Sequence, residues 1–374
     1  MHSLDVQRRS VVMMRGLLAA YIGFEACGCN MTQLAVETQA DIMERAYPAI
    51  ETQTDYDFAR LGIPANLVQL DGLLRVAPDN ERLLALASQG YASYAYGFVE
   101  DEMQQAESQG DLEAFDWQRA RARSMYLKAR DYGLRQLRVL EPEFPEVLPR
   151  DPDQLARVLN ENFRDPEQAA PLFWTGNALG SAINISRDDP ALVADLPLAR
   201  VLVKRSVELD ETYYHASGHV FLGVANASLG ESMGGNPAQG RQHFERALAL
   251  TQRRALLAQV NYAQAYAVQK SDKPLFTSLL NEVLKAPLQT GALALPNTIA
   301  KRRARRLLAQ VDTLILDSID DLPASAPLTP GTPGPDPEPP APEAAPAPAP
   351  AASDLPSPNP DTRKNTPTET SPPR

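Results

Sequence analysis

The amino-acid sequence predicts an all-α protein, in which a long array of helices is followed by a disordered tail rich in Pro and Ala. Two observations indicate helices: apolar residues recur mostly at spacings of three and four over residues 34–322, and the alternation typical of strands is absent. The third observation concerns residues 323–374, which hold 18 of the 33 prolines and no aromatic residue. Such a composition cannot bury a core, so we expect the folded domain to span residues 30–322.

The first 28 residues have the pattern of a secretory signal peptide. A basic start precedes a short apolar run over residues 16–24, and small residues follow it together with the only two cysteines, Cys27 and Cys29. Ala26 and Gly28 stand where a bacterial lipobox requires small residues, so we expect cleavage before Cys29 and lipidation of its thiol. Cys27 is the alternative acceptor, and a buried N-terminal helix of a cytosolic protein is the alternative to export.

Helix-forming segments follow one another along the remaining chain. Leu67, Leu70 and Leu74 share one helical face, and a turn over residues 78–81 separates them from a second helix that contains Tyr94 and Phe98. Asp79 or Asn80 in that turn is a natural helix N-cap. Further helices are predicted over residues 120–140, 174–185, 198–209, 213–229, 238–250, 255–268, 275–284 and 298–316.

Two of these helices carry the pattern of a small residue, an aromatic and an Ala that is typical of the second helix of a tetratricopeptide repeat. The two sets are Ala122, Tyr126, Ala129 and Gly240, Phe244, Ala247. Small residues let one helix pack closely against the next, and the aromatic ring fills the space above them. We therefore predict a degenerate, tetratricopeptide-like helical repeat array without a clean period of about 34 residues.

The charge of the chain argues against nucleic acid as a partner. The 36 basic and 47 acidic residues give a net charge of −11, of which the six acids and three bases of the tail contribute −3. Nucleic-acid binding needs a net basic surface, because the protein must neutralise phosphates. No apolar run reaches the roughly eighteen residues needed to span a bilayer, so we expect no multi-pass membrane protein.

One dense basic run, Lys301–Arg306, leaves two interpretations open. The cations can form a solvated helix face that pairs with acids on a neighbouring helix. Alternatively, one or two of them face an internal cavity and hold an anionic ligand, and Lys301 and Arg302 are the candidates.

Other candidate ligand-binding residues are aromatic or amide side chains on predicted helices. Trp174 and Asn177 lie three residues apart on one face, and nearby glycines leave room beside them. Tyr94, Phe98 and Glu100 form a second such group. The alternative for the aromatic residues is a place in the hydrophobic core, and the simplest interpretation of Glu100–Glu102 is an exposed acidic turn.

Motifs for catalysis are weak. Gly230–Gly234 matches the G-x-S-x-G nucleophile elbow, but a helix precedes it where that motif needs a strand, which favours a loop. A serine hydrolase that uses Ser232 remains the alternative from a different class of function. His215 and His219 lack a third zinc ligand, so we expect hydrogen-bonded histidines at a packing face or cavity wall. We predict no catalytic activity, no metal and no cofactor.

Several stretches, taken together and in order, resemble the T-component (TatT) family of TRAP transporters. They are Leu73–Asn80, Tyr91–Asp101, Tyr126–Leu134, Trp174–Asn177, Gly234–Pro237, His243–Ala247 and Asn297–Ala304. The resemblance covers roughly residues 34–316 and does not extend to the Pro/Ala tail.

The resemblance implies a periplasmic lipoprotein that is an accessory subunit of a TRAP-type transport system. It also implies a periplasmic TRAP solute-binding protein as partner, self-association into an oligomer, and a small apolar or anionic ligand that passes through an internal channel. The alternative is a general tetratricopeptide-like scaffold lipoprotein of the bacterial envelope, which assembles partners without binding a ligand.

Overall fold

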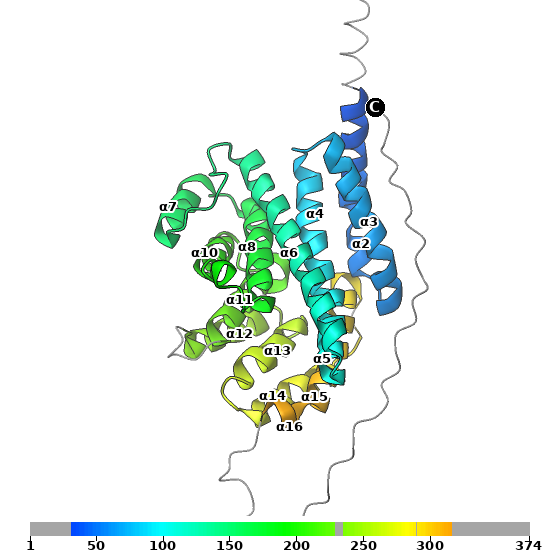
Figure 1. The fold of residues 1–374 in the computed structure, drawn as a ribbon, viewed down its shortest axis with the longest axis vertical. Helices are drawn as coiled ribbons and strands as arrows, with labels where there is room; N and C mark the ends of the chain where they lie inside the picture. Colours follow the sequence, from blue (N-terminus) through cyan, green and yellow to red (C-terminus); the bar gives the residue numbers. More distant parts are fainter. Residues whose placement is uncertain (1–30, 229–234, 289, 316–374) are drawn as a thin grey trace, which may run out of the picture. The chain divides into compact units, whose positions relative to one another are not determined.

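A computed structural model describes residues 31–228, 235–288 and 290–315, which consist of helices and connecting turns without a strand (Figure 1). The all-α prediction is therefore confirmed for the described part of the chain. No described helix has both the length and the apolar character needed to cross a membrane. The signal peptide predicted for residues 1–28, Cys29, the loop that contains Ser232 and the tail over residues 323–374 lie outside the described residues.

Residues 31–46 are helical, and the later elements follow in chain order. They are α2 (Pro48–Glu51), α3 (Tyr56–Val76), α4 (Glu81–Tyr94), η1 (Ala95–Val99), α5 (Glu100–Gln109), α6 (Leu112–Leu140), α7 (Pro152–Asn162), η2 (Pro166–Gln168), α8 (Ala169–Ile185), α9 (Pro190–Val193), α10 (Leu196–Leu209), α11 (Tyr213–Ala227), α12 (Pro237–Leu250), α13 (Leu257–Tyr262), η4 (Ala263–Ala267), α14 (Lys273–Lys285), η5 (Gly291–Leu293), α15 (Ala294–Ala309) and α16 (Val311–Leu314).

Short polar side chains start many of these helices. Asn80 accepts a hydrogen bond from the Leu83 N–H at 3.0 Å, which confirms the predicted cap of α4. Asp111 caps α6 in the same way, so this helix begins at Leu112, eight residues earlier than the sequence pattern indicated. Each such oxygen satisfies an N–H group that has no partner within the first turn of the helix.

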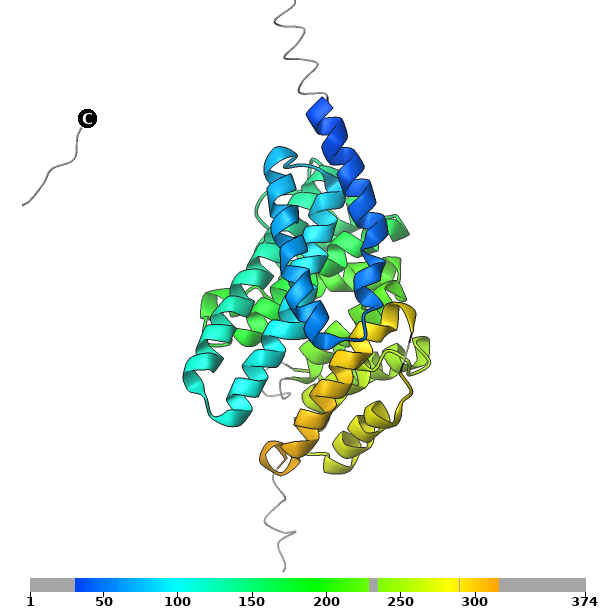
Figure 2. The same ribbon diagram turned by 90° about the vertical axis from the view of Figure 1, so that its right-hand side faces the viewer.

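Consecutive helices pack side by side along the chain. Contacts join α3 to α4, α4 to α6, α6 to α8, α8 to α10, α10 to α11 and α11 to α12. The last long helix, α15, then returns to contact α2 and α3, so an early and a late segment of the described chain lie side by side (Figure 2). This return encloses the space between the early and the late helices.

The close packing of α11 against α12 uses Gly240, one of the small residues in the predicted repeat pattern. A Cβ atom added to Gly240 would lie 2.8 Å from the Ala227 Cβ and 2.9 Å from the backbone oxygen of Gly223. Phe244 is fully buried, and its ring fills the space above Gly223. The expected close packing is therefore present at this pair, while a tetratricopeptide-like repeat remains a prediction.

Candidate functional site

A cavity of about 1090 Å³ lies among α2, α3, α4, α8, α11, α13 and α15. Much of its wall is apolar, and aliphatic and aromatic side chains come from both halves of the chain (Leu67, Leu70, Phe98, Phe173, Phe221 and Ile299). Pockets of this kind suit ligands with a large apolar body, and a few polar groups then fix the orientation of the ligand.

Irregular backbone shapes three parts of the cavity wall. The segments η1 and η4 are π-helical turns, and both contribute lining residues. At the start of α11, Tyr214, His215 and Ala216 have φ between 45° and 59°, in the left-handed region. Because π-helical turns and left-handed non-glycine residues cost free energy, they persist mainly where the surrounding structure holds them, often at functional sites.

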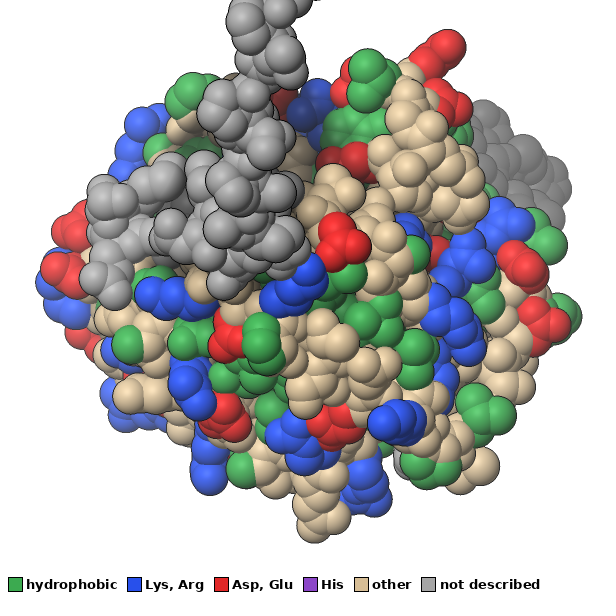
Figure 3. Space-filling model, turned by 90° about the horizontal axis from the view of Figure 1, so that it is seen from below, with side chains coloured by type: hydrophobic (Ala, Val, Ile, Leu, Met, Phe, Trp, Pro, Cys, Tyr) green, Lys and Arg blue, Asp and Glu red, His purple; other side chains and the backbone are tan. Residues whose placement is uncertain are grey.

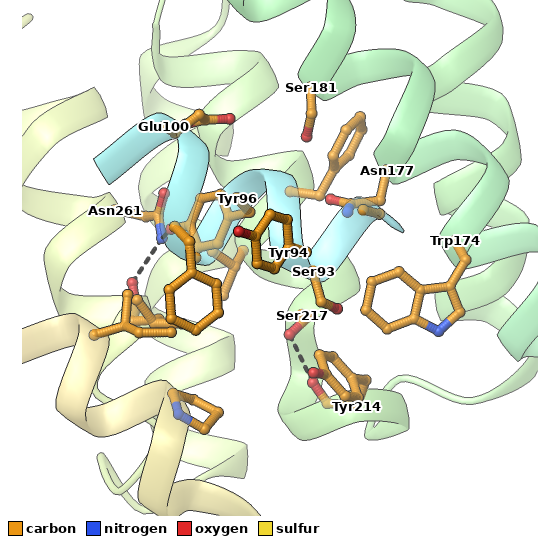
Figure 4. Close-up of a pocket in the computed structure, with 18 of the residues that line it drawn as sticks. Ser93, Tyr94, Tyr96, Glu100, Trp174, Asn177, Ser181, Tyr214, Ser217 and Asn261 are labelled. Carbon is orange, nitrogen blue, oxygen red and sulfur yellow. Dashed lines mark hydrogen bonds between the residues drawn. The ribbon is translucent and has the colours of Figure 1, made fainter. Parts of the chain in front are cut away.

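Five of the candidate ligand-binding residues predicted from the sequence line the cavity: Trp174, Asn177, Tyr94, Phe98 and Glu100. Trp174 and Asn177 on α8 point toward the segment that carries Tyr94 and Phe98. The close-up of the pocket shows Trp174, Asn177 and Tyr94 in this arrangement (Figure 4). Trp174, Tyr94 and Phe98 are each at most 5% exposed, so the alternative of core packing also describes these rings. The amide of Asn177 forms no hydrogen bond with another described residue, which leaves it available to a ligand.

Tyr213 and Tyr214 contact Trp174. The Trp174 Nε1–H donates to the Tyr213 hydroxyl at 2.9 Å, and Tyr214 packs edge-on against the indole. Burial raises the pKa of Tyr213 to about 12 and also raises the pKa of Glu51 above its ordinary value. Tyr213 does not line the cavity, but Tyr214 and Glu51 do, and burial also raises the pKa of Tyr214, so this part of the wall offers a neutral tyrosine hydroxyl at neutral pH.

The opposite part of the wall contains a buried guanidinium. Arg303 on α15 is 2% exposed, donates from Nη2 to the Tyr96 carbonyl oxygen, and lies 4.0 Å from the centre of the Tyr96 ring. The Tyr96 hydroxyl accepts a hydrogen bond from Asn261 at 2.8 Å. Although burial alone lowers the pKa of Arg303, nearby Tyr96 and Glu100 raise it overall, so Arg303 is charged.

The two cations that the sequence analysis chose from the basic run do not line the cavity. Lys301 donates to the carbonyl oxygens of Leu284 and Ala286, at the end of α14. Arg302 pairs with Asp101 at 2.5 Å, as expected for cations that bind acids on a neighbouring helix. Arg303 is the member of the run that reaches the cavity. On the face seen in Figure 3, basic side chains are interspersed with acidic and apolar ones.

The acidic segment at residues 100–102 is not the exposed turn that the sequence suggested. Glu100 is 6% exposed and Asp101 is fully buried, both within α5. Asp101 accepts hydrogen bonds from Arg302, from Arg306 at 2.6 Å and from the Tyr56 hydroxyl at 3.0 Å. Burial opposes ionisation of Asp101, but Arg306 and Arg302 outweigh it and hold the pKa of this carboxyl below its usual range.

Of the two histidines that the sequence was expected to place in hydrogen bonds, His219 forms them, and no described residue is hydrogen-bonded to the His215 ring. His215 lines the cavity, whereas His219 faces α12, where its Nδ1 lies 2.9 Å from the His243 Nδ1. The other ring nitrogen of His219 lies 3.3 Å from Glu211. Among the residues that the structure describes, no group of three or more His, Cys, Asp and Glu side chains could hold a metal ion.

Arg303 belongs to the basic run but was not among the predicted ligand-binding residues, although helical spacing distinguishes it from its neighbours. Leu295, Ile299 and Arg303 are four residues apart, so they share one face of α15, and all three line the cavity. Tyr96 and Asn261 had no comparable signal, because the π-helical turn in η1 and the pairing of distant helices position them. The assembled site can bind and orient a ligand.

Two comparisons with known proteins gave a match. The sequence profile of the TRAP transporter T-component family matches residues 52–315, a range that includes every helix from α3 to α16. An uncharacterized protein of Treponema pallidum (strain Nichols) is 24% identical over 306 residues, an alignment that covers 78% of this chain and 94% of the relative.

Proposed function

The chain belongs to the TRAP transporter T-component family, and from this premise we propose that it is a non-catalytic periplasmic accessory subunit that docks a solute-binding protein and holds a small ligand. Members of this family are components of a TRAP transport system. The docking of a solute-binding protein, the ligand and its passage through the protein are our proposals.

The cavity is the observation that supports a ligand. Its volume of about 1090 Å³ exceeds the small voids left by ordinary core packing, and it lies within one well-packed array of helices. The wall combines apolar side chains with one buried cation, which suits a small apolar or anionic molecule. Passage of the ligand between the solute-binding protein and this cavity would give the cavity a role in transport.

An exposed apolar row on α3 supports self-association. Residues 58, 61, 65, 68 and 72 follow the three-and-four spacing of a helix seam, and Phe58, Leu61 and Val68 are each at least 65% exposed. Exposed rows of this kind mark interaction surfaces. We propose that the α3 row, defined by these five positions, joins copies of this chain.

A substitution on the α3 row tests the oligomer. Leu61→Glu introduces a charge into the proposed interface, so we expect light scattering to report a smaller particle than for the unchanged protein. Val147→Glu is the matched control, because Val147 is 80% exposed and lies in the connection after α6. An unchanged mass for Leu61→Glu, or an equal effect of both variants, would overturn the assignment of this row.

The N-terminal pattern supports a lipid anchor in the envelope. We propose that the signal peptide over residues 1–28 directs export and that Cys29 carries the lipid, which would hold the folded domain in the periplasm. The Pro/Ala tail would then be a disordered extension of the folded domain, residues 30–322.

Co-purification from membranes, followed by mass spectrometry of proteins and small molecules, tests the transport role. We expect a periplasmic TRAP solute-binding protein to be recovered with the chain, together with a small apolar or anionic molecule. Recovery of unrelated envelope proteins without a solute-binding protein or a ligand would contradict the proposal and favour the general scaffold lipoprotein.

A further inference from the structure

The cavity contains one deeply buried guanidinium whose hydrogen-bonding capacity is mostly unused. Arg303 donates from Nη2 to the Tyr96 carbonyl oxygen, and its buried Nε has no hydrogen-bond partner. Nη1 also donates to no described residue, and no described carboxylate lies within ion-pair distance of the group. Buried guanidinium groups are ordinarily paired, since an unpaired one loses the hydrogen bonds that water supplied.

The surrounding charges do not balance Arg303. Asp101 is the nearest fully buried carboxylate, and Arg302 and Arg306 already bind both of its oxygens. Glu100 accepts a hydrogen bond from the buried Tyr126 hydroxyl. Even with both acids ionised, these three arginines face two carboxylates, so this group of five side chains carries one excess positive charge.

On the face of α15 that carries Arg303, the residues nearer the start of the helix are apolar. Ile299 and Leu295 lie one and two turns before it and also line the cavity. Apolar side chains from the facing helices, among them Phe98 and Leu257, continue this surface. A ligand that fits both features has a negatively charged end and a long apolar body.

We infer that Arg303 binds the anionic head group of an amphiphile, a carboxylate or a phosphate, whose apolar chain occupies the cavity. The inference rests on the proposed role of the cavity as a ligand site and adds the chemistry of the ligand. The Nη1–H groups of Arg303, which have no described partner, donate to the anion, and the apolar wall covers the chain. Arg suits this position better than Lys because its planar group can donate two parallel hydrogen bonds.

Three probes with the same twelve-carbon chain test the inference on the purified full chain. Dodecanoate, dodecyl phosphate and 1-dodecanol compete with the neutral fluorophore N-phenyl-1-naphthylamine, at concentrations below micelle formation. We expect at least one anion to bind about tenfold to a hundredfold more tightly than the alcohol, the range given by hydrogen bonds to a charged group. The ratio between the two anions distinguishes a carboxylate ligand from a phosphate ligand.

Substitutions then assign the preference to Arg303. In Arg303→Gln we expect the anion to bind as weakly as the alcohol, while the affinity for the alcohol stays unchanged. Arg302→Gln is the matched control, since Arg302 neighbours Arg303 in sequence but pairs with Asp101 away from the cavity. The control should keep the preference for the anion.

Several outcomes would overturn the inference. Equal binding of acid, phosphate and alcohol to the unchanged protein would remove the anion site and leave the cavity as an apolar ligand site. This comparison needs no variant, so it decides the question even if Arg303→Gln fails to fold. A preference that persists in Arg303→Gln would assign it to other groups. Failure of all three probes to displace the fluorophore would overturn the ligand role of the cavity as well.

Discussion

Replacement of Asp101 by Asn should destabilise the protein more than any similar exchange on its surface. Asp101 is fully buried and accepts three hydrogen bonds, from Tyr56, Arg302 and Arg306. Asn retains the shape but has one accepting oxygen, and its amide group would face a donor. The exchange therefore leaves Arg306, whose side chain is 12% exposed, without its counter-ion.

The expected loss follows from the burial of the pair. Removal of one partner of a buried ion pair costs about 3–5 kcal/mol, because the remaining charge is left uncompensated. Arg302 is 42% exposed and can regain water, so the lower half of this range applies. The assay is urea unfolding at pH 7, followed by circular dichroism.

Asp131→Asn is the matched control, since Asp131 also pairs with an arginine, Arg130, at 2.7 Å but is 59% exposed. Exposed pairs contribute about 0–1 kcal/mol, so the control should lose little. The pKa of Asp101 is held below its ordinary value, so its contribution is present above about pH 4 and is lost as the pH falls through the folded-state pKa. Equal losses for the two variants at pH 7 would refute the assignment of stability to the Asp101 cluster.

Two further predictions concern α11 and α12. Burial lowers the pKa of His219 and His243, so the unfolded chain binds protons first as the pH falls. The free energy of unfolding should therefore decrease below about pH 6.5, and a His219→Gln, His243→Gln double variant should show a shallower decrease in the same titration. Gly240→Ala should lose about 1–3 kcal/mol in urea unfolding, because its Cβ would meet backbone atoms. Gly62→Ala, with no atom within 4 Å of the added Cβ, should gain about 0.5–1 kcal/mol, and a loss at Gly62 equal to that at Gly240 would contradict this account.

The sequence predicted most of the helices because their signals are local. Leu67, Leu70 and Leu74 share one face of α3, and all three are buried as that spacing indicates. The helix over residues 31–46 and α7 were missed, although Asp151 at the start of α7 is an ordinary N-cap. The break of α13 into the π-helical turn η4 had no local signal, because tertiary packing sets such turns.

The cavity was less predictable than the helices because it depends on pairs of distant elements. Trp174 and Asn177 could be found together, since both lie on α8 three residues apart. Tyr96 and Asn261 come together only because η1 and α13 are neighbours in space, although 165 positions separate the two residues. Spacing within one helix cannot predict such a pair.

Helix α15 illustrates why a dense run of charge has no single function. Consecutive helical residues lie about 100° apart, so neighbours in the run face different surroundings. Arg302 and Arg306, four residues apart, both reach Asp101 on α5 and fix the helix, while Arg303 between them faces the cavity. Because its neighbours occupy both oxygens of Asp101, Arg303 forms no ion pair with that carboxylate. The contacts that hold α15 in place thereby also keep one cation available to a ligand.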